Sequence, residues 1–204
     1  TATGAGNVIG AGGQEGIWII NGTTGTVIQG NRIGTDMTGT VNLGNAHAGV
    51  RIGNIGAPAN GNLIGGTAAG AGNVIAFNTE AGVAVDQNGG GASVNNAILG
   101  NSIFSNTGIG IDLDDSDSSP ASAGVTANDA GDADTGGNNR QNFPLITRAV
   151  TNATNRLAVG GTLNSIANTF FRIEIFSNTA GDLSGNGEGE TTSVRLKTHH
   201  CDRT

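Results

Sequence analysis

The sequence predicts an all-β protein: a right-handed parallel β-helix of about four coils, followed by a partial antiparallel β-sandwich-like segment. Two nearly identical phrases, "TATGAGNVIG" at 1–10 and "TAAGAGNVIA" at 67–76, lie 66 residues apart. A second phrase, headed by glycine, recurs at about half that spacing. Repeats at a fixed spacing are the signature of stacked-coil architectures. With 37 glycines in 204 residues, no window keeps a helical apolar period, so the repeats are not helical.

The Gly-headed phrase predicts the first set of stacked strands. It reads "GIWI" at 16–19, "GVRI" at 49–52, "GVAV" at 82–85 and "GIGI" at 108–111, at spacings of 33, 33 and 26 residues. Short pieces rich in β-branched residues suit strands. Alternate strand residues face opposite sides, so two inward columns are expected. They are Ile17, Val50, Val83 and Ile109, and Ile19, Ile52, Val85 and Ile111.

Two further strand-like fragments complete each repeat. One gives a column of Ile28, Ile64 and Ile98, and the other a column of Ile9, Ile33, Ile75 and Ile103. An asparagine precedes each strand of the last set: Asn7, Asn31, Asn73 and Asn101. A single such asparagine is equally consistent with an ordinary turn residue. Four in register favour a ladder of side-chain amide hydrogen bonds that runs from coil to coil.

The chain divides into four parts by composition. The repeats occupy 1–113, with excursions at 34–48 and 88–93, and an acidic Gly/Asn/Asp linker follows at 114–142. Alternating strands in 143–190 predict a partial β-sandwich. The last part, 191–204, contains the only lysine and the only cysteine, and we expect it to be unstructured. Because the chain begins inside a repeat phrase, we expect it to be a fragment of a longer protein.

Charge and composition exclude several functions. A net charge of −7 lacks the basic stripe that nucleic-acid binding requires. One cysteine excludes an internal disulfide, and no apolar run approaches the length of a membrane span.

The phrases "NLIGGTAAGAGNVIAFNTEAGVAV", "VIQGNRIGTDMTGTVNLGN", "GIGIDL" and "NDAGDADTGGNNRQNFPLI" resemble a bacterial family. They are similar to large secreted or surface proteins that carry right-handed β-helix repeats of the pectate-lyase-like superfamily. The resemblance covers roughly residues 1–190. It implies an exported, often adhesin-like protein, extracellular or on the cell surface, whose partners are polysaccharides or other cell-surface components. The acidic run at 114–117 is longer than the family's usual loop, and the chain after Glu190 matches nothing.

Enzymes of this superfamily act where carboxylates from neighbouring coils converge on the outer face of one sheet. The resemblance therefore implies Asp86, Asp112 and Asp114 as candidate catalytic residues on the Gly-headed sheet. Arg51 is a candidate for binding the carboxylate of an acidic sugar, and Trp18 for binding the sugar itself. His47 and Glu80, one repeat apart in a turn, form the other acid–base pair. The Gly-His-Gly motif of polygalacturonases is missing, and aromatic residues make up only 3% of the chain.

A calcium site is predicted in the linker. "NDAGDADTG" places Asp129, Asp132 and Asp134 ahead of Gly136, which lets several oxygens surround one Ca²⁺ on a turning backbone. The motif lacks a full twelve-residue loop and a closing glutamate. The alternative is a solvated acidic segment.

The sequence thus predicts a non-catalytic structural or adhesive module, with Ca²⁺ or polysaccharide as its ligand. The alternative is a polysaccharide lyase or glycoside hydrolase that acts on an acidic polysaccharide at the outward carboxylates. Ice binding ranks last, because the threonines recur in turns and not in register on strands.

Overall fold

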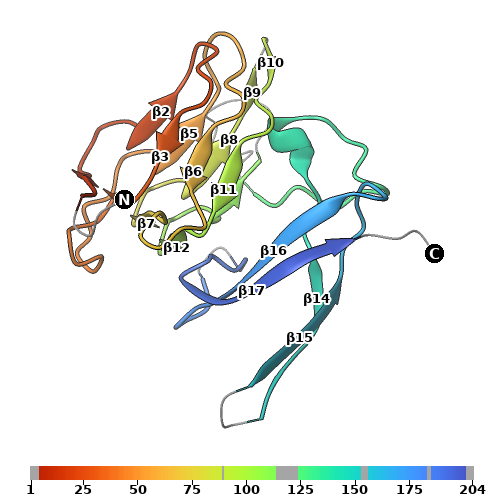
Figure 1. Ribbon diagram of the computed structural model, residues 1–204. Helices are drawn as coiled ribbons and strands as arrows, with labels where there is room; N and C mark the ends of the chain where they lie inside the picture. Colours follow the sequence, from red (N-terminus) through yellow and green to blue (C-terminus); the bar gives the residue numbers. More distant parts are fainter. Residues whose placement is uncertain (1–4, 89, 114–123, 153–155, 183–184, 201–204) are drawn as a thin grey trace.

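The computed structural model describes residues 5–88, 90–113, 124–152, 156–182 and 185–200 (Figure 1). In these residues the protein is nearly all β, and its one helical element is the short 3-10 helix η1, Gly137–Arg140. Asp114 lies outside the described residues.

Residues 5–113 form three parallel sheets, which the chain visits in the same order in each repeat. The first sheet contains β1 (Val8–Ile9), β4 (Arg32–Ile33), β7 (Val74–Ala76) and β12 (Ser102–Phe104). The second contains β2 (Ile17–Ile19), β5 (Val50–Ile52), β8 (Val83–Val85) and β13 (Ile111–Asp112). The third contains β3 (Val27–Ile28), β6 (Leu63–Gly65) and β11 (Ala97–Leu99). This stacking is compatible with a parallel β-helix.

The predicted apolar columns are confirmed over the first three coils. Ile17 pairs with Val50 and Val50 with Val83, while Ile19, Ile52 and Val85 align beside them. The columns from the other two sheets are in the predicted register as well. Most of these side chains belong to one buried core cluster, which explains why each position is Val or Ile.

The register of the last Gly-headed strand differs from the prediction by two residues. Ile111 pairs with Val83 and Asp112 with Ala84, so Gly110 heads this strand and not Gly108. Ile111 is 42% exposed, and Leu113 packs against the core in its place. A slip of two residues keeps every side chain on its face, so "GIGI" alone does not fix the register. The ladder hydrogen bonds, which join residues 28 apart in this coil, do fix it.

The predicted asparagine ladder is present. In each step, the main-chain N–H and Nδ2 of one asparagine both donate to Oδ1 of the next. Two more ladders run beside it. They are Asn45, Asn78 and Asn106, and Asn62, Asn96 and Asn138. Together the ladders satisfy polar groups that the stacking of coils buries.

The glycines that head the first three strands of the second sheet, Gly16, Gly49 and Gly82, are required by close packing. A Cβ on Gly49 would lie 2.4 Å from Cγ2 of Ile75 and 2.8 Å from Nδ2 of Asn78. Real Cβ atoms do not approach that closely, so a larger residue would push the strand away from the core and the ladder.

The two excursions are structured. In the first, Thr35 bridges Asn42, and the carboxylate of Asp36 accepts hydrogen bonds from Thr38, Thr40 and Val41. The second forms an antiparallel hairpin of β9 (Gln87–Asn88) and β10 (Gly91–Ala92).

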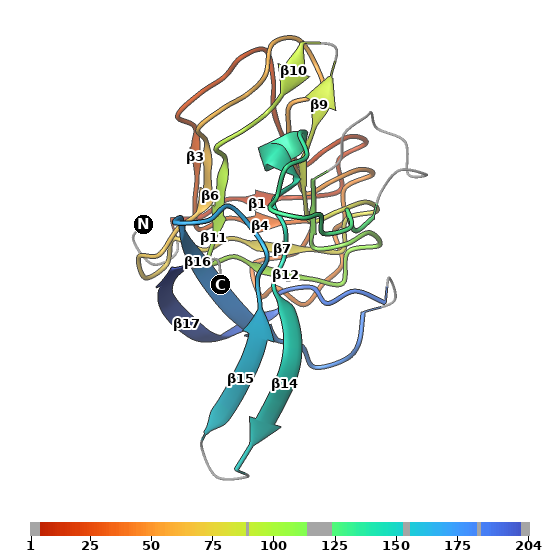
Figure 2. The same cartoon turned by 90° about the vertical axis from the view of Figure 1, so that its right-hand side faces the viewer.

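After the coils the strands are antiparallel, as predicted, but they form two separate two-stranded ribbons. β14 (Leu145–Thr151) pairs with β15 (Leu157–Thr162), and β16 (Phe170–Ser177) pairs with β17 (Thr191–His200). β17 corrects the prediction of an unstructured tail over 191–200: "TTSVRLKT" is rich in β-branched residues, and it finds a partner edge in β16. The β14–β15 ribbon projects away from the coils (Figure 2).

The C-terminal segments cover the last coil. Asn138 of η1 accepts a hydrogen bond from the main-chain N–H of Asn96 at 2.9 Å, so part of the predicted linker continues the third ladder. The main-chain N–H of Ile103 donates to Gly189 at 2.8 Å, and that of Gly100 donates to the carboxylate of Glu174 at 2.8 Å. These contacts satisfy polar groups that the open end of the stack would otherwise expose.

Candidate functional site

One row of residues crosses the second sheet on the face opposite the core. Trp18, Arg51, Ala84 and Asp112 are paired in register from β2 to β13. The sequence predicts Asp112 in line with Asp86, but the two-residue shift aligns it with Ala84. Asp86 follows directly after β8. The predicted residues that the structure describes, Trp18, Arg51, Asp86 and Asp112, therefore share one face of the sheet, in a register that differs from the expected one.

Arg51 is the centre of a buried ion-pair network. Its Nε donates to Glu15 at 2.8 Å, its Nη1 to Asp86 at 2.7 Å and its Nη2 to Glu80 at 2.5 Å. The side chain of Arg51 is 4% exposed and that of Asp86 is fully buried. All three edges of the guanidinium group are thus bound to carboxylates of this chain.

The network carries more negative than positive charge. Burial lowers the pKa of Arg51, but the charges of Asp86, Glu80 and Glu15 outweigh burial and raise the pKa above its ordinary value. Oε2 of Glu15 is buried and has no hydrogen-bond partner among the described residues. Nδ1 of His47 lies 2.8 Å from Oε1 of Glu80, so the pair expected from the sequence is formed. A partly exposed histidine therefore connects the network to the surface.

Glu15 is a member of this network that the sequence analysis missed. A signal for it exists, because Glu15, Glu80 and His47 all stand one or two residues before the glycine that heads a strand. In a stacked fold, this common position brings all three side chains to the same edge of the second sheet.

Trp18 and Asp112 are also engaged within the chain. Nε1 of Trp18 donates to the carbonyl oxygen of Gly53 at 3.0 Å. Asp112 is 3% exposed and accepts a hydrogen bond from the main-chain N–H of Gly124 at 3.1 Å. A polymer that used Asp86, Asp112 and Arg51 would have to displace these contacts first.

The predicted calcium ligands lie together. Asp129, Asp132 and Asp134 each place an oxygen within 4.8 Å of the others. Asp129 accepts a hydrogen bond from the N–H of Ala133 at 3.0 Å, and Asp132 accepts from Asn142 at 2.9 Å and from Oγ of Ser165. Burial raises the pKa of Asp134, and so do the charges of Asp129 and Asp132. A set of hard oxygen ligands whose charges repel one another fits Ca²⁺.

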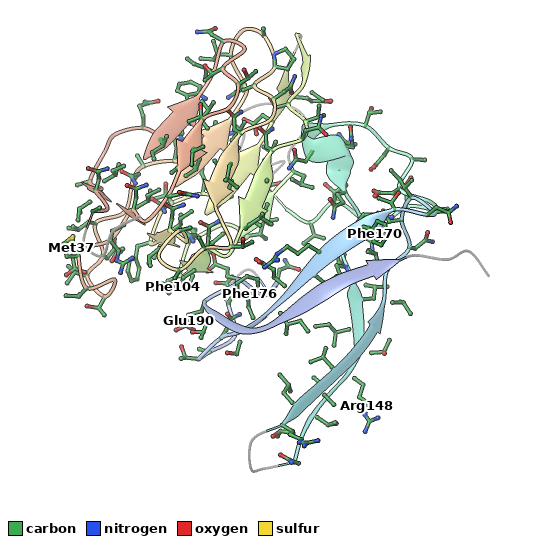
Figure 3. All side chains as sticks on the ribbon, viewed as in Figure 1. Met37, Phe104, Arg148, Phe170, Phe176 and Glu190 are labelled. Carbon is green, nitrogen blue, oxygen red and sulfur yellow. The ribbon has the colours of Figure 1, made fainter. Side chains whose placement is uncertain are left out.

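The β14–β15 ribbon carries an exposed apolar and cationic surface, which we call the ribbon surface. It comprises the side chains of Leu145, Ile146, Arg148, Val150, Arg156 and Leu157, all of them exposed. Between Asp134 and Glu174 the chain has four arginines and no acidic residue, in contrast to the acidic coils. Figure 3 shows Arg148 on the projecting ribbon, far from the coils.

Comparison of the chain with protein-family models, with curated proteins and with solved structures finds no match. Within the described residues, no helix has the length and hydropathy needed to cross a membrane.

Proposed function

We propose that this protein is a non-catalytic structural and adhesive module of an exported bacterial protein. The observation that carries the proposal is the binding of Arg51 by Glu15, Glu80 and Asp86 beneath the surface. Side chains that neutralise one another in this way stabilise stacked coils and leave few charges for chemistry. A buried ion pair is retained here as a structural element.

The same proposal includes the finer architecture, a closed right-handed parallel β-helix. Support comes from the constant order in which the chain visits the three sheets and from the three ladders along the stack. Connections between parallel strands are almost always right-handed.

The ribbon surface is the proposed adhesive site, and an acidic polysaccharide of a cell surface is its proposed partner. A two-stranded ribbon with both faces exposed buries little apolar area on its own, so a partner that covers it adds stability. Arg148 and Arg156 supply planar guanidinium groups that match carboxylates in a bidentate manner.

Calcium has a structural role in the proposal. Asp129, Asp132 and Asp134 would hold Ca²⁺ in the segment that leads from the coils to η1. Neutralising their charges would strengthen the turn that places Asn138 on the third ladder.

Binding to polygalacturonate tests the adhesive role. The double variant Arg148→Ser/Arg156→Ser is expected to weaken binding about tenfold or more, and added salt is expected to weaken wild-type binding, since the contact is electrostatic. Arg32→Ser, which removes an arginine from the coils, is the matched control and is expected to bind normally. Equal binding by wild type and the double variant would remove the ribbon surface from the proposal.

A turnover assay separates this function from the enzymatic alternative. Acidic polysaccharides are incubated with the protein, with and without Ca²⁺, and the products are measured. No turnover is expected. Turnover that disappears in Asp112→Ala would instead establish a lyase or hydrolase that uses the carboxylates of the second sheet.

A further inference from the structure

The second ladder ends in a glutamate instead of an asparagine. Asn78 donates to Oδ1 of Asn106, and Asn106 in turn donates to the carboxylate of Glu188. The distances are 3.2 Å from the main-chain N–H and 2.9 Å from Nδ2. Glu188, 82 residues further along the chain, thus takes the place that the next coil's asparagine would occupy.

Glu188 is buried at the contact between the last coil and the C-terminal segment. It is 6% exposed. A cavity of about 230 Å³ lies beside it, lined from the coil by Phe104 and Ser105. Asp182 and Glu190 line the same cavity from the C-terminal segment. Figure 3 shows Phe104, Phe176 and Glu190 gathered where the two parts meet.

The charged groups that face Glu188 are all acidic. Among the described lining residues, Asp182 and Glu190 are the other titratable groups, and none is basic. From the turn on the coil, Asn106 gives Glu188 two uncharged amide donors. The carboxylate of Glu190 is itself bound to Thr179 at 2.7 Å, which keeps it in place beside the cavity.

We propose that the contact between Glu188 and Asn106 is a pH-sensitive latch. While Glu188 is protonated, its buried carboxyl group holds the C-terminal segment on the last coil. When Glu188 ionises, Asn106 still donates to it, but the buried charge beside the acidic Asp182 loosens the segment. An asparagine would be neutral at every pH, so the change from Asn to Glu makes this end of one ladder responsive to protons.

The electrostatics of the site give the direction and the pH range. Burial raises the pKa of Glu188 to about 7, the hydrogen bonds from Asn106 lower it, and the charge of Asp182 and a hydrogen bond with it raise it. A carboxyl group whose pKa is raised in the folded state stabilises that state at low pH. The contribution is complete below the ordinary value of 4.5 and is lost as pH rises through about 7.

Two other contacts between the C-terminal segments and the last coil do not involve the carboxyl group of Glu188, so only the surroundings of Glu188 are expected to loosen. Gly189 still accepts from Ile103, and Glu174 still accepts from Gly100. The expected response is therefore faster opening of the segment, with the coils intact.

Hydrogen exchange of the whole chain, measured by mass spectrometry at pH 5.5, 7.0 and 8.5 and corrected for intrinsic rates, tests the latch. Peptides covering 104–108 and 185–190 are expected to lose protection on the order of tenfold between the lowest and highest pH, because one unit of pKa shift corresponds to a factor of ten. Peptides from the first two coils are expected not to change.

Three variants make the test specific. Glu188→Gln keeps an oxygen for Asn106 and is expected to abolish the pH dependence. Asp182→Asn removes the neighbouring charge that raises the pKa of Glu188 and is expected to move the loss of protection to lower pH; a midpoint that is unchanged or moves to higher pH would contradict the pairing. Glu190→Gln, in the same cavity, is the control and is expected to retain the wild-type response. Protection in the wild type that is equal at all three pH values, or a Glu188→Gln variant that still responds to pH, would overturn the latch.

Discussion

Arg51 and Asp86 bind each other across neighbouring strands of the second sheet, with 2.7 Å between Nη1 and Oδ2. Both side chains are covered, and Glu15 and Glu80 bind the remaining edges of the same guanidinium group. Four charges from three successive coils are therefore fixed to one another. The network thus joins successive coils on the face of the second sheet that points away from the apolar core.

Removing the guanidinium group is expected to destabilise the protein strongly. In Arg51→Met the carboxylates of Glu15, Glu80 and Asp86 lose the guanidinium group that binds all three while they stay buried, and breaking one side of a buried pair costs about 3–5 kcal/mol. Urea denaturation followed by circular dichroism measures the free energy of unfolding. Arg32→Met, on a half-buried side chain outside the network, is expected to change it by less than about 1 kcal/mol. Equal effects of the two substitutions would contradict a structural role for the network.

The ladders are expected to be weak at their ends and strong in the middle. Asn73 is 1% exposed and its side chain contacts both Asn31 and Asn101. Asn73→Ala leaves buried donors unsatisfied, so it is expected to destabilise by roughly 2–4 kcal/mol. Asn7→Ala, at the exposed end of the same ladder, is expected to lose less than about 1 kcal/mol. A thermal melt of the two variants side by side provides the measurement, and similar melting temperatures would count against cooperative ladders.

A single methyl group added to the glycine that precedes a strand of the second sheet is expected to disrupt the stacking of the coils. In Gly49→Ala the new Cβ overlaps Cγ2 of Ile75 and the carbonyl oxygen of Gly82 at 2.7 Å, and overpacking of this kind costs about 1–3 kcal/mol. Gly13→Ala is the matched control, because nothing lies within 4 Å of its added Cβ. Chemical denaturation should show a lower midpoint for the first variant alone. A normal midpoint for Gly49→Ala would mean that the coils separate easily.

Calcium is expected to raise the melting temperature through Asp129, Asp132 and Asp134. The ion would offset the burial and the repulsion by Asp129 and Asp132, which together raise the pKa of Asp134. Binding to the folded state alone adds about 2.7 kcal/mol at a ligand concentration one hundred times the Kd. Asp134→Asn should remove most of this effect. Asp36→Asn, in an excursion outside the cluster, should preserve it. A wild-type melting temperature that is unchanged by millimolar Ca²⁺ would refute the site.

The sequence predicts the parallel strands, their apolar columns and one of the ladders, because these features recur as short phrases with β-branched residues at fixed positions. It misses the second and third ladders for a physical reason. Asn45 and Asn78 lie 33 residues apart and Asn62 and Asn96 lie 34 residues apart, close to the repeat spacing, but asparagine is also an ordinary turn residue, and only the stacked coils show that these side chains bind one another.

The ends of the ladders are harder to predict than their centres. Asn138 and Glu188 come from outside the repeats, and only the folded chain brings them to Asn96 and Asn106. In the candidate site, the pairing of His47 with Glu80 follows from their common place in the repeat. The hydrogen bond from Arg51 to Glu15 depends on the conformations of both side chains, which the spacing of these residues in the sequence does not determine.

The terminal contacts have a consequence for evolution. Each winding presents the following one with an asparagine main-chain N–H in the same position, so Asn138 and Glu188 bind a group that every winding shares. Whole windings can therefore be gained or lost by duplication or deletion of the repeat in the gene, and the same C-terminal lid would still fit the shortened or lengthened stack.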